Sequence, residues 1–175
     1  KKKENYKDYI NDKKLQNEYI EYQSKYKKKP RESDKIVIDL LKKNIARNSS
    51  CNILDVACST GNFLYHLKNE IPNCNLNGMD LSKESIEYCK NQHDLNEINF
   101  FQDDITKLNC NTQYDVITAI AVTCLLNDDE LEKALNSIYK SLVRGLTCIY
   151  LFCVLLALST EKSDLDLRIA IKRFT

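Results

Sequence analysis

Three short stretches of the chain place acidic side chains directly after an apolar run. The first, at residues 52–63, reads "NILDVACSTGNF" and passes from its apolar run to Asp55 and then to a cluster of very small residues. The second is "GMD", which ends at Asp80, and the third is "FFQDDI", which contains Asp103 and Asp104. Because carboxylates accept hydrogen bonds and attract cations, these residues are candidates for binding a polar ligand with a positive charge.

The small residues after Asp55 indicate a backbone that a ligand approaches closely. Ala57, Ser59 and Gly61 stand at alternate positions and provide the clearance that a turn from a strand into a helix needs for this. A carboxylate at this turn would repel a pyrophosphate, whereas it suits a ligand that carries an ammonium or sulfonium group. The turn therefore argues against a dinucleotide.

The other two stretches suit the remaining parts of a nucleoside. Asp80 follows Asp55 by 25 residues and could accept hydrogen bonds from both hydroxyls of a ribose. Asp103 or Asp104 could accept from an adenine amine, with Ile105 against the ring. Two alternatives stay open: Asp55 and Asp80 could simply cap the helices that follow them, and only one of Asp103 and Asp104 can face an adenine.

The intervening residues predict alternating strands and helices that would position these carboxylates. Apolar runs predict strands over 51–57, 74–80, 98–102, 114–122 and 146–158. Amphipathic segments predict helices over about 4–25, 32–45, 61–70, 82–92 and 128–143, with Ser33 or Asp34 as the cap of the second. Strands that alternate with such helices form an α/β fold, in which a doubly wound, mostly parallel sheet has helices on both faces.

Composition indicates one globular domain. The 175 residues are 43% hydrophobic and 29% charged, which is enough to bury a sizeable core. We expect a helical lid or extension over residues 1–30 and the α/β core over 31–175. No segment has the features of a signal peptide, and the longest apolar run, at 146–158, is shorter than the roughly 20 residues that span a bilayer. We therefore expect a cytoplasmic protein with no membrane partner.

The eight cysteines predict neither a disulfide framework nor a metal site. They stand at residues 51, 58, 74, 89, 110, 124, 148 and 153. None forms a CxxC pair, and none has a histidine partner at the spacing of zinc ligands. We expect reduced cysteines that serve as small core residues.

The net charge of +1 conceals an asymmetry along the chain. Residues 1–50 carry fifteen Lys or Arg against eight Asp or Glu, and residues 51–175 carry eleven against seventeen. A basic arm can bind nucleic acid phosphates. In this arm, however, tyrosines at helical spacing are interleaved with charges of both signs, which favours an amphipathic helix packed through its tyrosines, and the acidic remainder would repel a polyanion. We therefore expect no nucleic acid partner.

In this order and spacing, the motifs resemble the class I S-adenosylmethionine-dependent methyltransferases, in their small methyltransferase-domain branch. In "LDVACSTGNF", Ala57 and Ser59 stand where the family usually has glycine. The resemblance continues through "GMDLS", "FFQDDITKL", "YDVITAIAV" and "SIYKSLVRG" and covers roughly residues 30–155. It implies a Rossmann-like fold and S-adenosylmethionine as the cofactor. Members continue after the fifth strand with a further helix and two antiparallel strands, so we expect a core that is incomplete at the C-terminus.

The resemblance also implies where each part of the cofactor would lie. Asp80 and Leu81 would contact the ribose and the adenine, and the family register favours Asp104, with Ile105, at the adenine. The methionine portion would lie among Asp55, Ala57, Ser59 and Gly61, above a floor of residues 119–122 that includes Ala121.

The function implied is methyl transfer from S-adenosylmethionine to an acceptor. Positioning can supply most of the acceleration in such a displacement, and no catalytic base is evident. The residues after the fourth predicted strand lack the Asp/Asn-Pro-Pro-aromatic motif of methyltransferases that modify nucleic acid amines. We therefore expect a small-molecule acceptor, with Tyr19 and Tyr26 as candidate walls of its pocket.

Two other functions stay open. A nicotinamide dinucleotide enzyme would need the motif G-x-G-x-x-G, of which "ACSTGN" lacks both early glycines. A non-catalytic cofactor-binding or scaffold protein could retain the methyltransferase fold without turnover.

Overall fold

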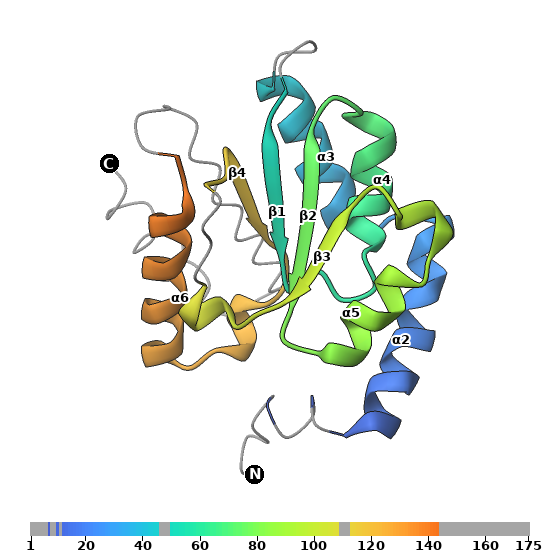
Figure 1. Cartoon of the computed structure of the whole chain (residues 1–175), viewed down its shortest axis with the longest axis vertical. Helices are drawn as coiled ribbons and strands as arrows, with labels where there is room; N and C mark the ends of the chain where they lie inside the picture. Colours follow the sequence, from blue (N-terminus) through green and yellow to red (C-terminus); the bar gives the residue numbers. More distant parts are fainter. Residues whose placement is uncertain (1–6, 8–9, 11, 46–49, 109–112, 144–175) are drawn as a thin grey trace.

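Four parallel strands form the centre of the computed structural model, which describes Lys7, Ile10 and residues 12–45, 50–108 and 113–143 (Figure 1). The strands are β1 (Asn52–Val56), β2 (Asn75–Asp80), β3 (Asn99–Gln102) and β4 (Val116–Ala119), in the sheet order β3-β2-β1-β4. The helices are α2 (Lys13–Lys28), α3 (Glu32–Asn44), α4 (Asn62–Glu70), α5 (Lys83–Lys90) and α6 (Asp128–Ser141). Three short 3₁₀ turns are η1 (His93–Leu95), η2 (Ile105–Lys107) and η3 (Thr123–Leu125).

Helices cover both faces of the sheet. In Figure 1, α3, α4 and α5 lie on one side with α2 outside them, and α6 lies on the other side. The buried side chains of β1 alternate accordingly: Ile53 belongs to the core under α3 and α4, whereas Leu54 and Val56 belong to the core under α6. A strand that is buried on both faces is characteristic of a parallel sheet. The predicted doubly wound α/β fold is confirmed.

Some predicted boundaries differ from the observed ones. Helix α2 begins only at Lys13, because the side chain of Asp12 accepts hydrogen bonds from two backbone N–H groups of the first turn. Neither predicted cap of α3 holds the N-cap position, which belongs to Arg31; Asp34 instead accepts a hydrogen bond from the Arg31 backbone N–H at 3.2 Å. The strand predicted over 146–158 lies outside the described residues.

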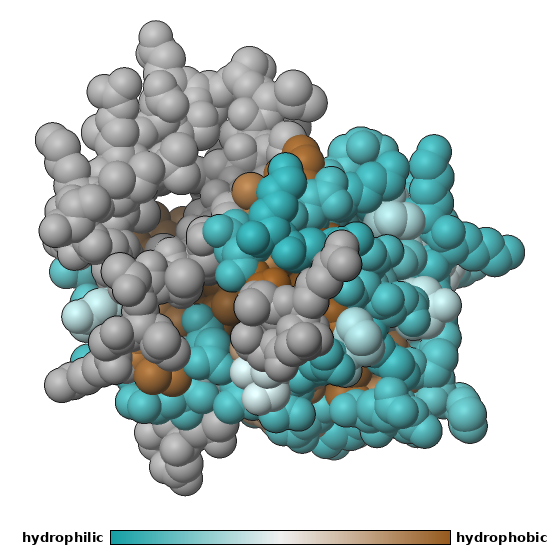
Figure 2. Space-filling model, turned by 90° about the horizontal axis from the view of Figure 1, so that it is seen from above, coloured by the Kyte–Doolittle hydropathy of each residue, from teal (hydrophilic) through white to brown (hydrophobic). Residues whose placement is uncertain are grey.

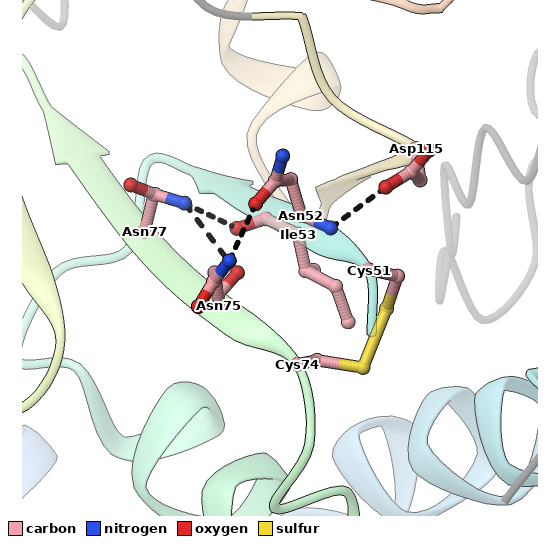
Figure 3. The surroundings of a disulfide bond; sticks show 7 residues. All are labelled: Cys51, Asn52, Ile53, Cys74, Asn75, Asn77 and Asp115. Carbon is pink, nitrogen blue, oxygen red and sulfur yellow. Dashed lines mark hydrogen bonds between the residues drawn. A yellow bond between two sulfur atoms is a disulfide. The ribbon is translucent and has the colours of Figure 1, made fainter. Parts of the chain in front are cut away.

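The prediction that the cysteines are all reduced is wrong for Cys51 and Cys74, which form a disulfide (Figure 3). These residues directly precede β1 and β2, and the parallel register pairs Asn52 with Asn75. The two cysteines are therefore neighbours, with their Cα atoms 4.7 Å apart, although 23 positions separate them in the sequence. Among the described residues, Cys58, Cys89 and Cys124 are free thiols; Cys58 and Cys89 are buried, and Cys124 is exposed.

Polar residues dominate the described surface. Figure 2 shows hydrophilic residues over most of that surface in the view from above, with hydrophobic residues between them. In the part of the chain that the structure describes, no helix is both long enough and apolar enough to cross a membrane.

The turn between β1 and α4 has an unusual backbone. Ala57, Ser59 and Gly61 adopt positive φ angles of 58°, 51° and 72°, and Ala121 after β4 adopts 59°. Glycine adopts this left-handed conformation readily, whereas a residue with a Cβ atom is strained in it. The turn therefore keeps a glycine-type conformation at two positions that hold other residues.

Replacing Ala57 by glycine should stabilise the fold. Relief of the left-handed strain contributes about 1–2 kcal/mol, and the freedom of glycine in the unfolded chain offsets about 0.4–1 kcal/mol of it. We expect Ala57→Gly to raise the free energy of unfolding by about 0.5–1 kcal/mol in urea denaturation. Ala119→Gly, in β4 and outside the positive-φ region, is the control and should destabilise. If both variants lowered the free energy of unfolding equally, the inference that the backbone at Ala57 is strained would be wrong.

Candidate functional site

The segments that follow the four strands meet at one edge of the sheet. The register sets Val56 beside Met79 on β2 and beside Ala119 on β4, so the carboxyl ends of these strands are level. A cavity of about 750 Å³ lies at this edge. Its lining includes most of the residues predicted from the sequence, namely Tyr19, Asp55, Ala57, Ser59, Asp80, Leu81, Asp103, Asp104, Ile105 and Ala121.

Two predicted residues do not line the cavity. Gly61 is the N-cap of α4, and a Cβ atom built on it would lie 3.0 Å from Leu95 Cδ1 and 3.1 Å from Phe100 Cζ, in the core. Its role is therefore to let the turn pack against the core at a positive φ. The ring of Tyr26 makes an edge-to-face contact with that of Tyr22 at 6.0 Å between centroids and is not part of the cavity wall.

Asp55 is a buried carboxyl group at the end of β1. Its side chain accepts a hydrogen bond of 2.7 Å from Thr118 Oγ1, and the residue is only 3% exposed. Burial raises its pKa to about 7; the hydrogen bond from Thr118 opposes this rise, and the nearby carboxyl groups of Asp34 and Asp80 add to it. Asp55 can therefore change its charge near neutral pH when a cation binds.

Asp80 connects the turn after β1 to the turn after β2. Its two carboxylate oxygens accept hydrogen bonds of 2.8 Å, one from the backbone N–H of Ser59 and the other from that of Ser82. Burial raises the pKa of Asp80, and these hydrogen bonds oppose the rise. The cap alternative is wrong for both Asp55 and Asp80, because the N-cap of α4 is Gly61 and that of α5 is Ser82. Asp80 instead holds the two turns together and lines the cavity.

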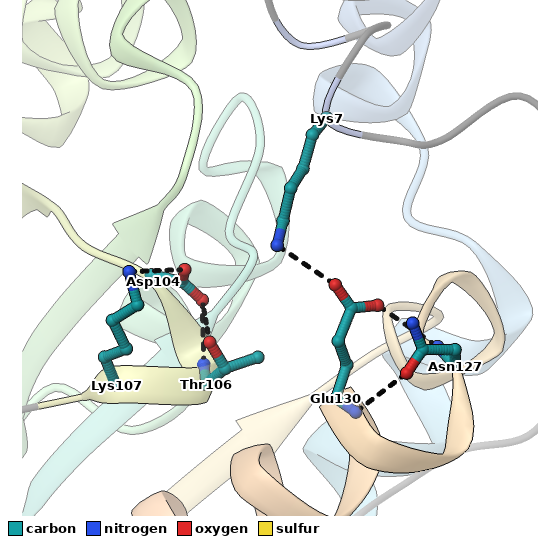
Figure 4. Close-up of polar contacts among 6 residues, drawn as sticks. All are labelled: Lys7, Asp104, Thr106, Lys107, Asn127 and Glu130. Carbon is teal, nitrogen blue, oxygen red and sulfur yellow. Dashed lines mark hydrogen bonds and ion pairs between the residues drawn. The ribbon is translucent and has the colours of Figure 1, made fainter.

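The adenine candidates are both at the cavity wall but differ in their local contacts. Asp104 caps η2 by accepting from Thr106 N at 2.9 Å and Thr106 Oγ1 at 2.7 Å, and it lies 3.9 Å from Lys107 Nζ (Figure 4). Although burial acts to raise the pKa of Asp104, the bonds from Thr106 and the charge of Lys107 outweigh it, so the pKa is lowered. Asp103 accepts the backbone N–H of Asp104 at 2.8 Å.

The cavity also holds a polar atom with no partner among the described residues. Ser59 Oγ is buried and makes no hydrogen bond there. Burying a hydroxyl without a partner costs free energy, and a ligand that forms a hydrogen bond with Ser59 Oγ would offset this cost. The chemistry of the site therefore fits a ligand with polar groups beside the turn of residues 57–61.

One part of the wall is apolar. It consists of residues after β4, among them Ile120, Val122, Leu125 and Leu126. Leu125, in η3, is 57% exposed. An exposed leucine beside a cavity suits contact with an apolar part of a ligand.

Sequence reasoning missed several polar residues of the cavity, and five of them come from α2, α3 and the N-cap between these helices. Gln16, Gln23 and Asp34 are at most 3% exposed, and they line the cavity together with Arg31 and Ser33. The sequence holds only a weak signal for them: Gln16 and Gln23 are seven residues apart, which puts them on one face of α2.

The chain's start also reaches across to α6. Lys7 Nζ lies 3.0 Å from Glu130 Oε1 in the first turn of α6, and Glu130 also takes part in the capping box with Asn127 (Figure 4). Ile10 lines the cavity. Described residues before α2 thus contact both the cavity and the helix beyond it.

Comparison with known proteins shows which family the sequence matches. The methyltransferase domain family matches residues 53–145, more than half of the chain. A malonyl-[acyl-carrier protein] O-methyltransferase of Bacillus cytotoxicus is 30% identical over 124 residues, which cover 71% of this chain and 41% of that protein. The human tRNA N(3)-cytidine methyltransferase METTL6 is 30% identical over 105 residues, covering 56% and 37%. The chain thus spans about two fifths of the length of these relatives.

Solved structures support the same fold. A TehB-like methyltransferase from Corynebacterium glutamicum superposes with a TM-score of 0.60 at 21% identity, over 75% of this chain and 68% of that one. The plantazolicin methyltransferase BpumL superposes with a TM-score of 0.61 at 19% identity, over 77% and 51%. Both the motifs around Asp55 and Asp80 and the sheet that positions them agree with the family match, and the chain belongs to the methyltransferase domain family.

Proposed function

We propose that the chain binds S-adenosylmethionine in this cavity and transfers its methyl group to a small-molecule acceptor. The observation that carries the proposal is the convergence of Asp55, Asp80 and Asp104, from three strand ends, on one cavity of a methyltransferase-family chain. The structure of BpumL was determined with S-adenosylhomocysteine, and that of the amino pentose methyltransferase CalS10 with S-adenosylmethionine.

The residues of the cavity suit each part of this cofactor. Asp80 retains lone pairs beyond those used by its two backbone donors and would accept from the ribose hydroxyls. Asp55 would face the cationic methionine portion, beside Ser59 Oγ, which has no hydrogen-bond partner in the part of the chain that the structure describes. Asp104 and Ile105 would contact the adenine. When bound, the cofactor supplies a methyl group on a good leaving group, so the chain's main task is to position it against the acceptor.

The acceptor would enter between the apolar wall after β4 and the N-terminal helices. A cavity of about 750 Å³ is within the range of small-molecule sites. Its described lining carries several carboxyl groups and one cation, Arg31, which disfavours a polyanion. We propose that residues 1–30 act as the lid of this pocket, with Tyr19 in its wall and Lys7 paired to Glu130 at its far side.

Radiolabelling of a fractionated cell extract tests which class of molecule accepts the methyl group. Incubation with radiolabelled S-adenosylmethionine should label the small-molecule fraction in proportion to enzyme concentration, and leave the protein and RNA fractions at background. Labelled RNA would favour a tRNA acceptor of the kind named for the human relative. Cofactor binding without label in any fraction would favour a non-catalytic binding protein.

Titration calorimetry tests the cofactor and the role of Asp80. The chain should bind S-adenosylmethionine and S-adenosylhomocysteine but not NAD. Asp80→Asn removes a charge from the ribose contact, and hydrogen bonds to charged groups contribute about 1.5–3 kcal/mol, so affinity should fall about 10- to 100-fold. Asp39→Asn, on the exposed side of α3, is the matched control. A folded Asp80→Asn variant with unchanged affinity would remove Asp80 from the site.

The raised pKa of Asp55 predicts opposite effects on stability and binding. The folded protein keeps the proton of Asp55 up to about pH 7, whereas the unfolded chain loses it near the ordinary value of 3.8. The native state therefore binds more protons between these values, and stability falls as the pH rises across this window. Because asparagine does not titrate, the Asp55→Asn variant should not lose this stability as the pH rises.

We expect Asp55→Asn to raise Tm by a few degrees at pH 8, with the gain shrinking toward pH 4, in thermal melts. The same variant should bind S-adenosylmethionine more weakly than the wild type at pH 8, because the carboxylate that faces the cation is absent. A gain in Tm that does not depend on pH would show that Asp55 does not titrate in this window.

A further inference from the structure

The disulfide between Cys51 and Cys74 lies at the edge of the sheet opposite the cavity. Each cysteine directly precedes a strand, Cys51 before β1 and Cys74 before β2, whereas the cavity lies where these strands end. Figure 3 shows the bond beside Asn52 and Asn75, the first residue pair in the register of the two strands. Neither cysteine lines the cavity, so an effect of this bond on the site must pass through the folded state of the chain.

The disulfide closes a loop around much of the candidate site. Its two cysteines are 23 positions apart, and the loop contains β1, the turn of residues 57–61 and α4. Asp55, Ala57 and Ser59 therefore all lie within it. A cross-link stabilises a fold mainly by restricting the unfolded chain, and this effect grows with the length of the loop that it closes. The bond should therefore stabilise the folded state that contains the cavity.

Hydrogen bonds also hold the strand starts that the disulfide joins. The backbone N–H of Asn75 donates to Cys51 O at 2.7 Å, and the side-chain amide of Asn75 donates to Asn52 Oδ1 at 3.0 Å. On the other side of β1, the backbone N–H of Asn52 donates to Asp115 Oδ2 at 2.8 Å. Because β1 is bonded to both neighbours at its start, reduction of the disulfide can lower the stability of the fold without changing its architecture.

The two cysteines differ in exposure. Cys51 is 9% exposed, whereas Cys74 is only partly buried and follows Pro72 and Asn73, which are exposed in the turn after α4. A thiolate from solution can therefore reach Cys74 more easily than Cys51. The disulfide coexists with an exposed free thiol, that of Cys124. Unpaired exposed thiols are typical of reducing environments, in which a disulfide is transient and regulatory rather than permanent.

We propose that the Cys51–Cys74 disulfide is a reversible redox switch that controls the stability of the fold around the cavity. A dithiol opens it and a small disulfide, such as glutathione disulfide, closes it. Between the melting temperatures of the two forms, the oxidised chain is folded and the reduced chain is unfolded. The redox state then decides whether the cavity exists.

The opening step is an exchange between thiols and disulfides. One thiolate of the dithiol bonds to Cys74 Sγ and breaks the S–S bond, and Cys51 leaves as a thiolate that takes up a proton. The second thiolate of the dithiol then bonds to the first sulfur of the dithiol, and Cys74 leaves in the same way. Two electrons pass from the dithiol to the protein, and the dithiol ends as a cyclic disulfide.

Thermal melts of the full chain with and without dithiothreitol test the switch. For a loop of this length, dithiothreitol should lower the Tm of the oxidised wild type by about 5–10 °C. The double variant Cys51→Ala, Cys74→Ala should not respond to dithiothreitol. Cys124→Ser removes an exposed thiol outside the disulfide and is the control, which should respond as the wild type does. Alkylation with mass spectrometry identifies the free thiols in each sample.

Reoxidation tests whether the switch is reversible. When glutathione disulfide replaces dithiothreitol, Cys51 and Cys74 should lose their reactivity toward alkylation and the higher Tm should return. Below both melting temperatures, the two forms should have the same circular dichroism spectrum. The proposal is wrong if Cys51 and Cys74 stay free in glutathione disulfide, if reduction leaves the Tm unchanged, or if the double variant responds like the wild type. Should the double variant not fold, the melts of the wild type and of Cys124→Ser decide. No ligand is needed, so the test is independent of the proposed function.

Discussion

The parallel pairing of β1 with β2 on one side and with β4 on the other is the constraint on which the cavity depends. Because parallel strands all end at the same edge, this pairing brings together segments that are far apart in the sequence. Asp55 is level with Gly78 on β2 and with Thr118 on β4. Thr118 can therefore donate to Asp55 at 2.7 Å, across 63 positions of sequence.

Gly78 in β2 is a position of very close packing against α4 and β3. A Cβ atom on Gly78 would lie 2.6 Å from Phe100 Cε1 and 2.8 Å from Leu64 Cδ1, closer than real atoms approach. The absence of this atom allows α4 and β3 to pack closely on β2. Helix α4 begins at Asn62, six residues after β1 ends, and residues 57–60 of the connecting turn line the cavity.

The cavity is costly for the folded chain. Ala57 and Ser59 adopt strained left-handed angles, Ser59 Oγ is buried without a partner among the described residues, and burial raises the pKa of both Asp34 and Asp55. Each of these features lowers stability, and each lies at one cavity. Concentrated strain and perturbed titration are typical of sites that bind ligands, where the bound molecule compensates for them.

The sequence by itself determined the fold class and the strand-end carboxylates. Hydrophobic periodicity is a local property, so it located β1, β2 and α6 within a few residues. The strand ends predicted Asp55, Asp80 and either Asp103 or Asp104 as ligand contacts, and all four residues line the cavity. The tertiary structure decided which residues distant in the sequence come into contact. Parallel register joined Cys51 to Cys74, and helix packing directed Arg31 and Asp34 into the cavity while leaving Tyr26 outside it. These outcomes depend on contacts between distant segments, which no local pattern encodes.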